Sequence, residues 1–87
     1  MQNFSLITGS AGLLGEFHAY ALLEIGHNLV ITDLNLIKLM KLSKKLKKKY
    51  PNSLILSFRM DVTSEKSIES VKRKVKKQKG IINNLIN

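Results

Sequence analysis

Three glycines near the N-terminus have the spacing of a phosphate-binding turn. They lie in Thr8-Gly9-Ser10-Ala11-Gly12-Leu13-Leu14-Gly15, between an apolar run and a stretch with helical periodicity. Gly9 would turn the chain off a strand, Gly12 would let a pyrophosphate approach the backbone, and Gly15 would let the helix pack close to the sheet. The N–H groups and dipole at the helix N-terminus would then bind the negative charge. No lysine is required, and none precedes Lys38, which argues against a P-loop with its Gly-Lys-Ser/Thr.

An acidic residue follows where it could bind the adjoining sugar. Asp33 ends the second apolar run of the chain. A carboxylate there can accept hydrogen bonds from the adenosine ribose hydroxyls, and it would repel a 2′-phosphate, which favours NAD over NADP. Alone, Asp33 is more simply a helix cap or a solvated strand end, and the glycines alone could serve only turn geometry. Together, and in this order, they favour a dinucleotide site, in which Thr8 and Ser10 either contact phosphate or only shape the turn.

The elements that would position these residues alternate along the chain. Because parallel neighbours need long crossovers, the alternation predicts an α/β fold, a partial Rossmann fold whose parallel four-stranded sheet has the order 3-2-1-4 with three crossover helices. The expected strands are Phe4–Thr8, Asn28–Asp33, Leu54–Met60 and Ile81–Asn87, and the expected helices run from Leu13 to Ile25, within Leu34–Tyr50, and over Ser64–Lys79.

Helix ends and faces are also predicted by residue type. Gly26 suits a left-handed cap of the first helix, Thr63 or Ser64 suits the N-cap of the third, and Gly80 would close it. The apolar faces are expected at Leu14, Phe17, Ala21, Leu22 and Ile25 in the first helix, at Ile37, Met40, Leu42, Leu46 and Tyr50 in the second, and at Ile68, Val71 and Val75 in the third.

Size and composition exclude several classes of protein. The 87 residues allow one domain, and the chain has no cysteine for a disulfide or a thiolate metal site. His18 and His27 are too far apart to chelate a metal from one helical face, so no metal is expected. The N-terminus lacks the basic start of a secretory signal, and no apolar run approaches the ~20 residues that span a bilayer. A cytoplasmic protein is the default expectation.

The net charge of +9 is carried by one part of the chain. Residues 1–37 hold three acids and no base, whereas residues 38–87 hold all fifteen Lys and Arg. A nucleic-acid site is one interpretation of such asymmetry. The basic runs Lys44–Lys49 and Lys72–Lys77, however, lie on predicted amphipathic helices and have no interleaved aromatic residue to stack on bases. Solvated helix faces are therefore the favoured interpretation.

The motifs resemble those of the short-chain dehydrogenase/reductase family over essentially the whole chain. Thr8 to Gly15 is similar to the family's TGxxxGxG or TGxxGxxG cofactor turn, Asp33 to its NAD-selecting acid, and Asp61-Val62 to the pair that contacts adenine. Leu85-Ile86-Asn87 is similar to the opening of the Asn-Asn-Ala-Gly signature of the fourth strand. The glycine spacing is more typical of the extended branch, whereas Asp61-Val62-Thr63 and Leu85-Ile86-Asn87 resemble the shorter branch, so subfamily and substrate stay open.

The resemblance implies an oxidoreductase that acts on a carbonyl or alcohol group with NAD(P). Its proton-transfer groups, a Ser and a Tyr-x-x-x-Lys, lie beyond the fourth strand in the family. Tyr20 and Tyr50 are followed four positions later by Glu24 and Leu54, so neither begins this motif. Residues 1–87 are therefore expected to be a truncated NAD(P)-binding Rossmann domain, inactive alone, with no catalytic residue. The implied cofactor residues are Thr8, Gly9, Ser10, Gly12, Leu13, Leu14, Gly15, Asp33, Asp61, Val62 and Asn87.

Two other functions remain open, namely a stand-alone nucleotide-binding module and, less favoured, a basic nucleic-acid-binding protein. The topology also has a consequence for partners. Two helices would cover one sheet face and the third would begin to cover the other, which leaves the outer edge of the fourth strand exposed. The missing C-terminal half of the fold is the expected partner, and the isolated chain is expected to associate with itself through this edge.

Overall fold

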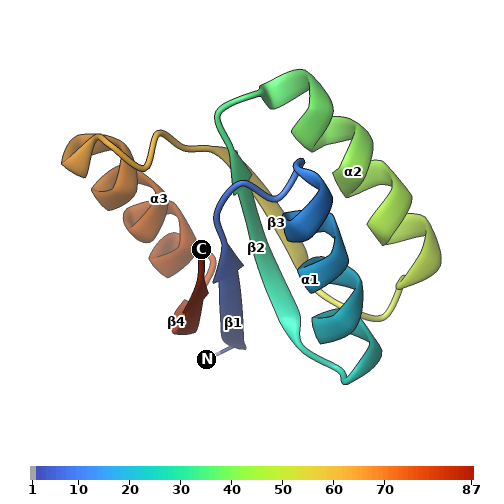
Figure 1. The fold of residues 1–87 in the computed structure, drawn as a ribbon. Coiled ribbons are helices and arrows are strands. Elements are labelled where there is room, and N and C mark those ends of the chain that lie inside the picture. The colour runs from blue at the N-terminus through green and yellow to red at the C-terminus, as the bar shows by residue number, and fades with distance from the viewer. Residues whose placement is uncertain (1) are drawn as a thin grey trace.

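A computed structural model describes residues 2–87 as a parallel four-stranded sheet with three helices (Figure 1). The strand order is β3-β2-β1-β4, and all three neighbouring pairs are parallel. The predicted fold class and strand order are therefore confirmed. The strands are β1 (Gln2–Ile7), β2 (Asn28–Asp33), β3 (Ile55–Arg59) and β4 (Gly80–Ile86), and the helices are α1 (Leu13–Glu24), α2 (Leu36–Lys49) and α3 (Glu65–Lys77).

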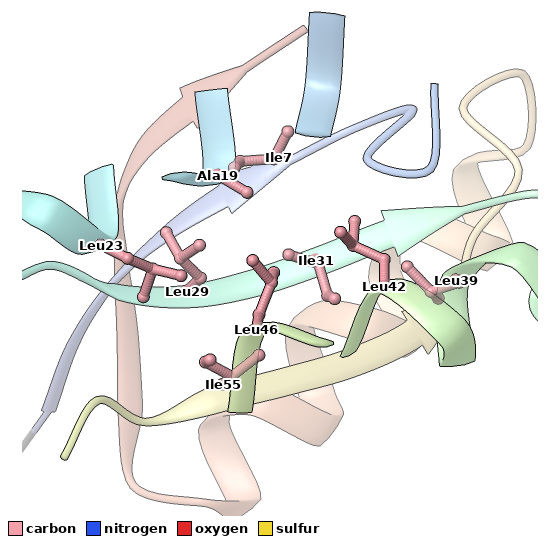
Figure 2. Packing of buried hydrophobic residues seen from close by; sticks show 9 residues of the cluster. All are labelled: Ile7, Ala19, Leu23, Leu29, Ile31, Leu39, Leu42, Leu46 and Ile55. Carbon is pink, nitrogen blue, oxygen red and sulfur yellow. The ribbon is translucent and has the colours of Figure 1, made fainter. Parts of the chain in front are cut away.

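Helices cover both faces of the sheet, α1 and α2 on one side and α3 on the other (Figure 1). Alternate residues of the central strands point to opposite faces, both of which are covered, so the consecutive residues 4–7 of β1 and 29–32 of β2 are all buried. Figure 2 shows the cluster under α1 and α2, which contains Ile7, Ala19, Leu23, Leu29, Ile31, Leu39, Leu42, Leu46 and Ile55. The cluster under α3 contains Phe4, Leu6, Val30, Met60, Val71 and Val75.

The buried face of α1 is not the one expected from its leucines. Helix α1 buries Gly15, Ala19 and Leu23, whereas the side chain of Phe17 is 67% exposed. Because α1 carries apolar residues on every side, periodicity could not select the face that packs. The small residues on the chosen face let the helix lie close to the strands. Of the predicted stripe, Leu22 is half-buried, and the residues that face outward are Leu14, Phe17, Ala21 and Ile25.

In α2 and α3 the prediction is closer to the structure. Helix α2 buries Leu42 and Leu46 as expected, but it also buries Leu39 and Ser43, and it leaves Ile37 and Met40 exposed. Between Lys41 and Lys49 the only apolar residues are Leu42 and Leu46, and both are buried, so the pattern is informative in this part of α2. In α3 the predicted Val71 and Val75 are buried and Ile68 is half-buried.

The end of α3 differs from the expectation that Gly80 closes the helix. The left-handed residue is Lys79, with a φ of 58°, and Gly80 is the buried first residue of β4. A Cβ atom on Gly80 would lie 2.7 Å from Cε2 of Phe4 and 2.9 Å from Cγ1 of Val75. Glycine is needed at position 80 for packing, so the backbone reversal falls on the preceding lysine. At the other helix ends, Ser64 rather than Thr63 caps α3, and Gly26 has the expected positive φ.

Strand β4 pairs with β1 through a bulge. Phe4 pairs with Ile82, but Ser5 pairs with Asn84, so one residue of β4 is unpaired. The bulge places Ile82 and Leu85 on the α3 side of the sheet, although they are three positions apart. Within residues 2–87 no strand pairs with the outer edge of β4, and Leu85 is 62% exposed there. No helix of the described residues has both the length and the apolarity to cross a membrane.

Candidate nucleotide-binding site

The glycine turn leaves the carboxyl end of β1 at the point where the sheet order reverses. From β1 the chain moves in one direction to β2 and β3, and in the other direction to β4. In open α/β sheets, such a switch point is where crossovers on opposite faces separate and leave a crevice. The turn opens with Gly9 at a φ of 61°, and the N–H of Gly12 donates to the carbonyl of Gly9 at 3.1 Å.

Gly15 is the position of the turn at which a side chain would clash most severely. A Cβ atom there would lie 2.2 Å from the carbonyl oxygen of Gly9 and 2.8 Å from Cα of Ser10. Both contacts are with backbone, which cannot rotate away as a side chain can. The sequence predicted that Gly15 lets the helix pack close to the sheet, whereas the nearest atoms to a Cβ at this position belong to the glycine turn itself. At Gly12 the same construction leaves 3.3 Å to the Gly9 oxygen, a much milder conflict.

Ser10 anchors the turn from below. Its side chain is fully buried, and its hydroxyl donates to the carbonyl of Ile7 at 2.9 Å and accepts from the N–H of Thr32 at 3.0 Å. The Ser10 N–H donates to the carbonyl of Thr32 at 2.9 Å. These three hydrogen bonds tie the turn to β1 and β2. Of the two roles considered for Ser10, the structure favours shaping the turn over touching a phosphate.

Asp33 lies beside the turn, as the motif spacing predicts. Its Oδ2 accepts from the N–H of Ala11 at 3.0 Å, and its Oδ1 accepts from the N–H of Asn35 at 2.9 Å. Asn35 is the N-cap of α2, so one carboxylate joins the glycine turn to the start of the next helix. A carboxylate offers about four lone-pair positions, so Asp33 keeps acceptor capacity for further hydroxyl donors.

The first N–H groups of α1 have no acceptor in the protein. The N-cap is Gly12, which provides no side-chain acceptor, and within residues 2–87 the N–H groups of Leu13, Leu14 and Gly15 make no hydrogen bond. Only from Glu16 onward does the helical ladder begin, with its N–H donating to the carbonyl of Gly12. Unpaired donors at a helix N-terminus, reinforced by the helix dipole, bind anions.

A cleft of about 450 Å³ opens at these N–H groups, and we refer to it as the turn cleft. Thr8 links its two sides, because its hydroxyl donates to Oδ1 of Asn87 at 3.2 Å and its N–H donates to the carbonyl of Ile86. Every residue that lines the turn cleft is one of the predicted site residues. They are Thr8, Gly9, Gly12, Leu13, Leu14, Gly15, Val62 and Asn87.

Asp61 shapes the loop that carries Val62 to the turn cleft. Its Oδ1 accepts from the hydroxyl of Thr63 at 2.6 Å and from the N–H of Thr63 at 2.9 Å. These two hydrogen bonds, with a smaller contribution from the charge of Arg59, lower the pKa of Asp61 below its usual value. The carboxylate is therefore charged at neutral pH. It does not line the turn cleft itself, so the structure brings Asp61 to its border rather than into it.

The family model for short chain dehydrogenases matches residues 3–87. The chain belongs to the short-chain dehydrogenase family. No sequence among curated proteins matches it.

Solved structures show the same fold. L-sorbose reductase from Gluconobacter frateurii, complexed with NADPH and L-sorbose, has a TM-score of 0.89 at 23% identity over 99% of this chain and 32% of that chain. A protein assigned as a D-mannonate oxidoreductase from Haemophilus influenza, with bound NAD, has a TM-score of 0.84 at 23% identity over 97% of this chain and 29% of that chain. Sorbitol-6-phosphate 2-dehydrogenase from Erwinia amylovora has a TM-score of 0.78 at 26% identity over 84% and 28%. The chain thus spans less than a third of each of these proteins.

The short-chain dehydrogenase fold of this chain has a second hollow next to the turn cleft. This apolar pocket, of about 500 Å³, shares Thr8, Val62 and Asn87 with the turn cleft and continues under α3. Leu6 and Ile82 form part of its floor. A flat, weakly polar group could bind in this apolar pocket, away from water. A charged group attached to it could at the same time bind at the N–H groups of α1.

Sequence reasoning missed two contributors to the site. Ala11 donates its backbone N–H to Asp33, and no side-chain pattern announces such a contact. Asn35 caps α2, with its Oδ1 accepting from the N–H of Lys38 at 3.1 Å. An asparagine just before a helical pattern is a known N-cap signal, so Asn35 could have been found. His27 lies away from the site and pairs with Ser5, 2.9 Å from Nδ1 to Oγ.

Proposed function

We propose that this chain binds NAD(P) and forms the cofactor-binding part of an NAD(P)-dependent oxidoreductase that acts on a carbonyl or alcohol group. The observation that carries the proposal is the set of unpaired N–H groups on Leu13, Leu14 and Gly15, which belong to residues that line the turn cleft. The carboxylate of Asp33 does not line this cleft, but it is held against the same glycine turn by the N–H of Ala11. A ligand that carries an anion close to a hydroxyl group could accept hydrogen bonds from these N–H groups and donate one to the carboxylate. The diphosphate and adenosine ribose of NAD(P) have that arrangement.

Each part of the cofactor then has a place. The diphosphate would accept from the N–H groups at the start of α1, and the ribose hydroxyls would donate to Asp33. The adenine would pack against Val62 in the apolar pocket. Thr8 and Asn87 would lie between the diphosphate and the nicotinamide. The bound NADPH of the sorbose reductase and the bound NAD of the H. influenza protein support a dinucleotide on this fold.

NAD is the preferred cofactor in this proposal. The carboxylate of Asp33 is held beside the glycine turn by two backbone N–H groups, and we propose that the ribose binds there. It would accept from free 2′- and 3′-hydroxyls, and it would repel the charge of a 2′-phosphate.

The chemistry itself would be divided between the cofactor and other parts of the fold. When bound, the nicotinamide supplies or accepts a hydride. The residues of this chain would hold and orient the adenosine and diphosphate, and they contain no Tyr-x-x-x-Lys for proton transfer. We therefore propose that residues 1–87 form an NAD(P)-binding unit and that proton transfer requires groups outside it.

Calorimetric titration with NAD tests the proposal. We expect saturable binding at one site, whereas nicotinamide mononucleotide, which lacks the adenosine, should bind at least about tenfold more weakly because the described contacts lie at the adenosine end. Absence of heat at millimolar NAD would exclude both the cofactor-binding part and the stand-alone nucleotide-binding module.

The basic residues do not favour a nucleic-acid function. The runs Lys44–Lys49 and Lys72–Lys77 lie on α2 and α3, which cover opposite faces of the sheet (Figure 1). A duplex could contact only one of these helices at a time, so the charge does not form a single phosphate-binding surface. The solvated-face interpretation is the one we retain.

The outer edge of β4 is the proposed contact with a further strand. This edge carries Ile81 and Leu85, which are both exposed, next to unpaired backbone groups. We propose that the rest of the fold covers it and that the isolated chain associates there with itself.

In sedimentation velocity, the isolated chain should therefore form oligomers as its concentration rises. Leu85→Lys should weaken association by about tenfold or more, because like charges would meet at the edge. Ile37→Lys, at an exposed position on α2, is the matched control and should leave association unchanged. A wild-type chain that stays monomeric at all concentrations would contradict the proposal.

A further inference from the structure

The outer edge of β3 is the second unpaired edge of the sheet. Strand β3 pairs with β2, and within residues 2–87 no strand lies on its other side. Hydrogen bonds to β2 come from alternate residues, including the carbonyl of Leu54 and the N–H of Met60. The backbone groups of Ile55, Ser57 and Arg59 therefore point outward. Ile55 is buried, so the accessible N–H and C=O groups of this edge are those of Ser57 and Arg59.

A groove of about 410 Å³ lies at the beginning of this edge, and we call it the edge groove. Lys47 of α2 and Gln78, which follows α3, both line it. Because α2 and α3 cover opposite faces of the sheet (Figure 1), the edge groove reaches from one face to the other beside β3. Its apolar wall includes Leu54, Ile55 and Leu56.

Cations from three elements flank the edge. Lys47 of α2 lines the edge groove, and Nζ of Lys74 in α3 lies 5.6 Å from the ring centre of Phe58 in β3. Arg59 belongs to β3 itself, and its Nε donates to the carbonyl of Leu34 at 3.1 Å. Among the described residues, none of these three cations forms an ion pair. The edge is therefore positively charged as well as unpaired.

The charge disfavours a second copy of this chain as the partner. Lysines at a strand edge discourage pairing between identical chains, and a chain with a net charge of +9 would bring more cations to the edge. The edge also offers apolar surface, since Leu54 is 45% exposed and both Leu56 and Phe58 are half-buried. Free backbone groups, apolar side chains and unpaired cations together fit an extended segment that is acidic and partly apolar.

We propose that the outer edge of β3 binds an extended acidic segment of a partner protein as an added strand. The backbone of this segment would pair with Ser57 and Arg59. Its apolar side chains would pack against Phe58, and its carboxylates would lie near Lys47 and Lys74. The edge groove shares no lining residue with the turn cleft, so this interaction is separate from the proposed binding of the cofactor.

Fluorescence anisotropy with a labelled peptide of alternating glutamate and valine tests the proposal. At low ionic strength we expect this glutamate peptide to bind at least about tenfold more tightly than the same peptide with lysine in place of glutamate. Methylation of its backbone nitrogens should weaken binding by about tenfold or more, because the donors of an added strand are lost. Equal binding of the glutamate and lysine peptides, or binding of neither, would overturn the proposal. So would an oligothymidylate of equal charge that binds as tightly as the glutamate peptide.

Two double variants test the cations. Lys47→Gln/Lys74→Gln should lower affinity for the glutamate peptide by about fivefold or more. The matched control, Lys41→Gln/Lys76→Gln, removes one charge from each of the same helices. Lys41 lines a hollow between α1 and α2, and Lys76 lies one turn after Lys72, which lines the apolar pocket beside β4. Both control positions face away from β3, so the loss should stay below about twofold. Equal losses in the two double variants would contradict the proposed site.

Ser57→Pro tests the backbone pairing, because it removes an N–H that points outward and leaves the ladder to β2 intact. We expect it to lower affinity for the glutamate peptide by about tenfold or more. Ser57→Ala is the control, since it also loses the hydroxyl bonded to Ser43 but keeps the N–H. A Ser57→Pro chain that is folded by circular dichroism and binds as tightly as Ser57→Ala would exclude an added strand here. If Ser57→Pro does not fold, the methylated peptide makes the same test.

Leu85→Lys separates the two edges of the sheet. Leu85 is exposed at the outer edge of β4, so this variant should not lower affinity for the glutamate peptide. If Leu85→Lys lowers the affinity and Lys47→Gln/Lys74→Gln does not, the peptide binds at β4 and the proposal for β3 is wrong.

Discussion

Replacing Gly15 with valine is expected to destabilise the chain by about 3 kcal/mol, the upper end of what an overpacked site usually costs, and to abolish NAD binding. The reason is the position of the missing side chain, whose Cβ would lie 2.2 Å from the Gly9 carbonyl oxygen. The backbone of Gly9 and Ser10 would have to shift, and Ser10 is hydrogen-bonded to two strands. Urea unfolding followed by circular dichroism would measure the loss.

The control for this prediction is Gly12→Ala. Its Cβ would meet only the Gly9 oxygen, at 3.3 Å, so we expect a loss below about 1 kcal/mol. If Gly15→Val fails to fold, Gly15→Ala replaces it, since the clash begins at Cβ. Equal unfolding midpoints for Gly15→Ala and Gly12→Ala would show that the turn is not as tightly packed as the structure indicates.

The strand order and the place of the glycine turn could be predicted because few alternatives satisfy the same sequence. Short apolar runs separated by longer amphipathic segments require parallel strands with crossovers, and right-handed crossovers leave one simple topology. The turn then falls at the carboxyl end of β1 whatever the details of packing. Its proximity to Asp33 follows as well, because β2 lies next to β1 and ends on the same side of the sheet.

Other features depend on contacts that a single sequence does not show. The hydroxyl of Ser10 could point to a ligand or to the sheet, and only the positions of Ile7 and Thr32 decide between them. The glycine after α3 was expected to be a cap, but packing against Phe4 requires Gly80 in β4 and moves the left-handed residue to Lys79. Local rules assign a residue type one usual role, and tertiary packing can give it another.

Asp33→Asn is expected to lower NAD affinity by about 10- to 100-fold, because a charge-assisted hydrogen bond contributes more than a neutral one and one of several is lost outright. The carboxylate accepts from Ala11 with one oxygen and from Asn35 with the other. An amide has one oxygen, so one of these N–H groups would face an NH₂ group instead. The turn, the start of α2 and the proposed ribose contact would all be affected by the replacement of one oxygen with an NH₂ group.

The same substitution should shift the choice of cofactor. Without the negative charge of Asp33, the repulsion of a 2′-phosphate disappears, so NADP should lose much less affinity than NAD. The charge-matched control is Glu69→Gln on α3, where the carboxylate forms only an exposed ion pair with Lys72. It should leave both affinities unchanged, because such surface pairs contribute little. An Asp33→Asn variant that binds NAD as tightly as the wild-type chain would show that the ribose does not bind at Asp33.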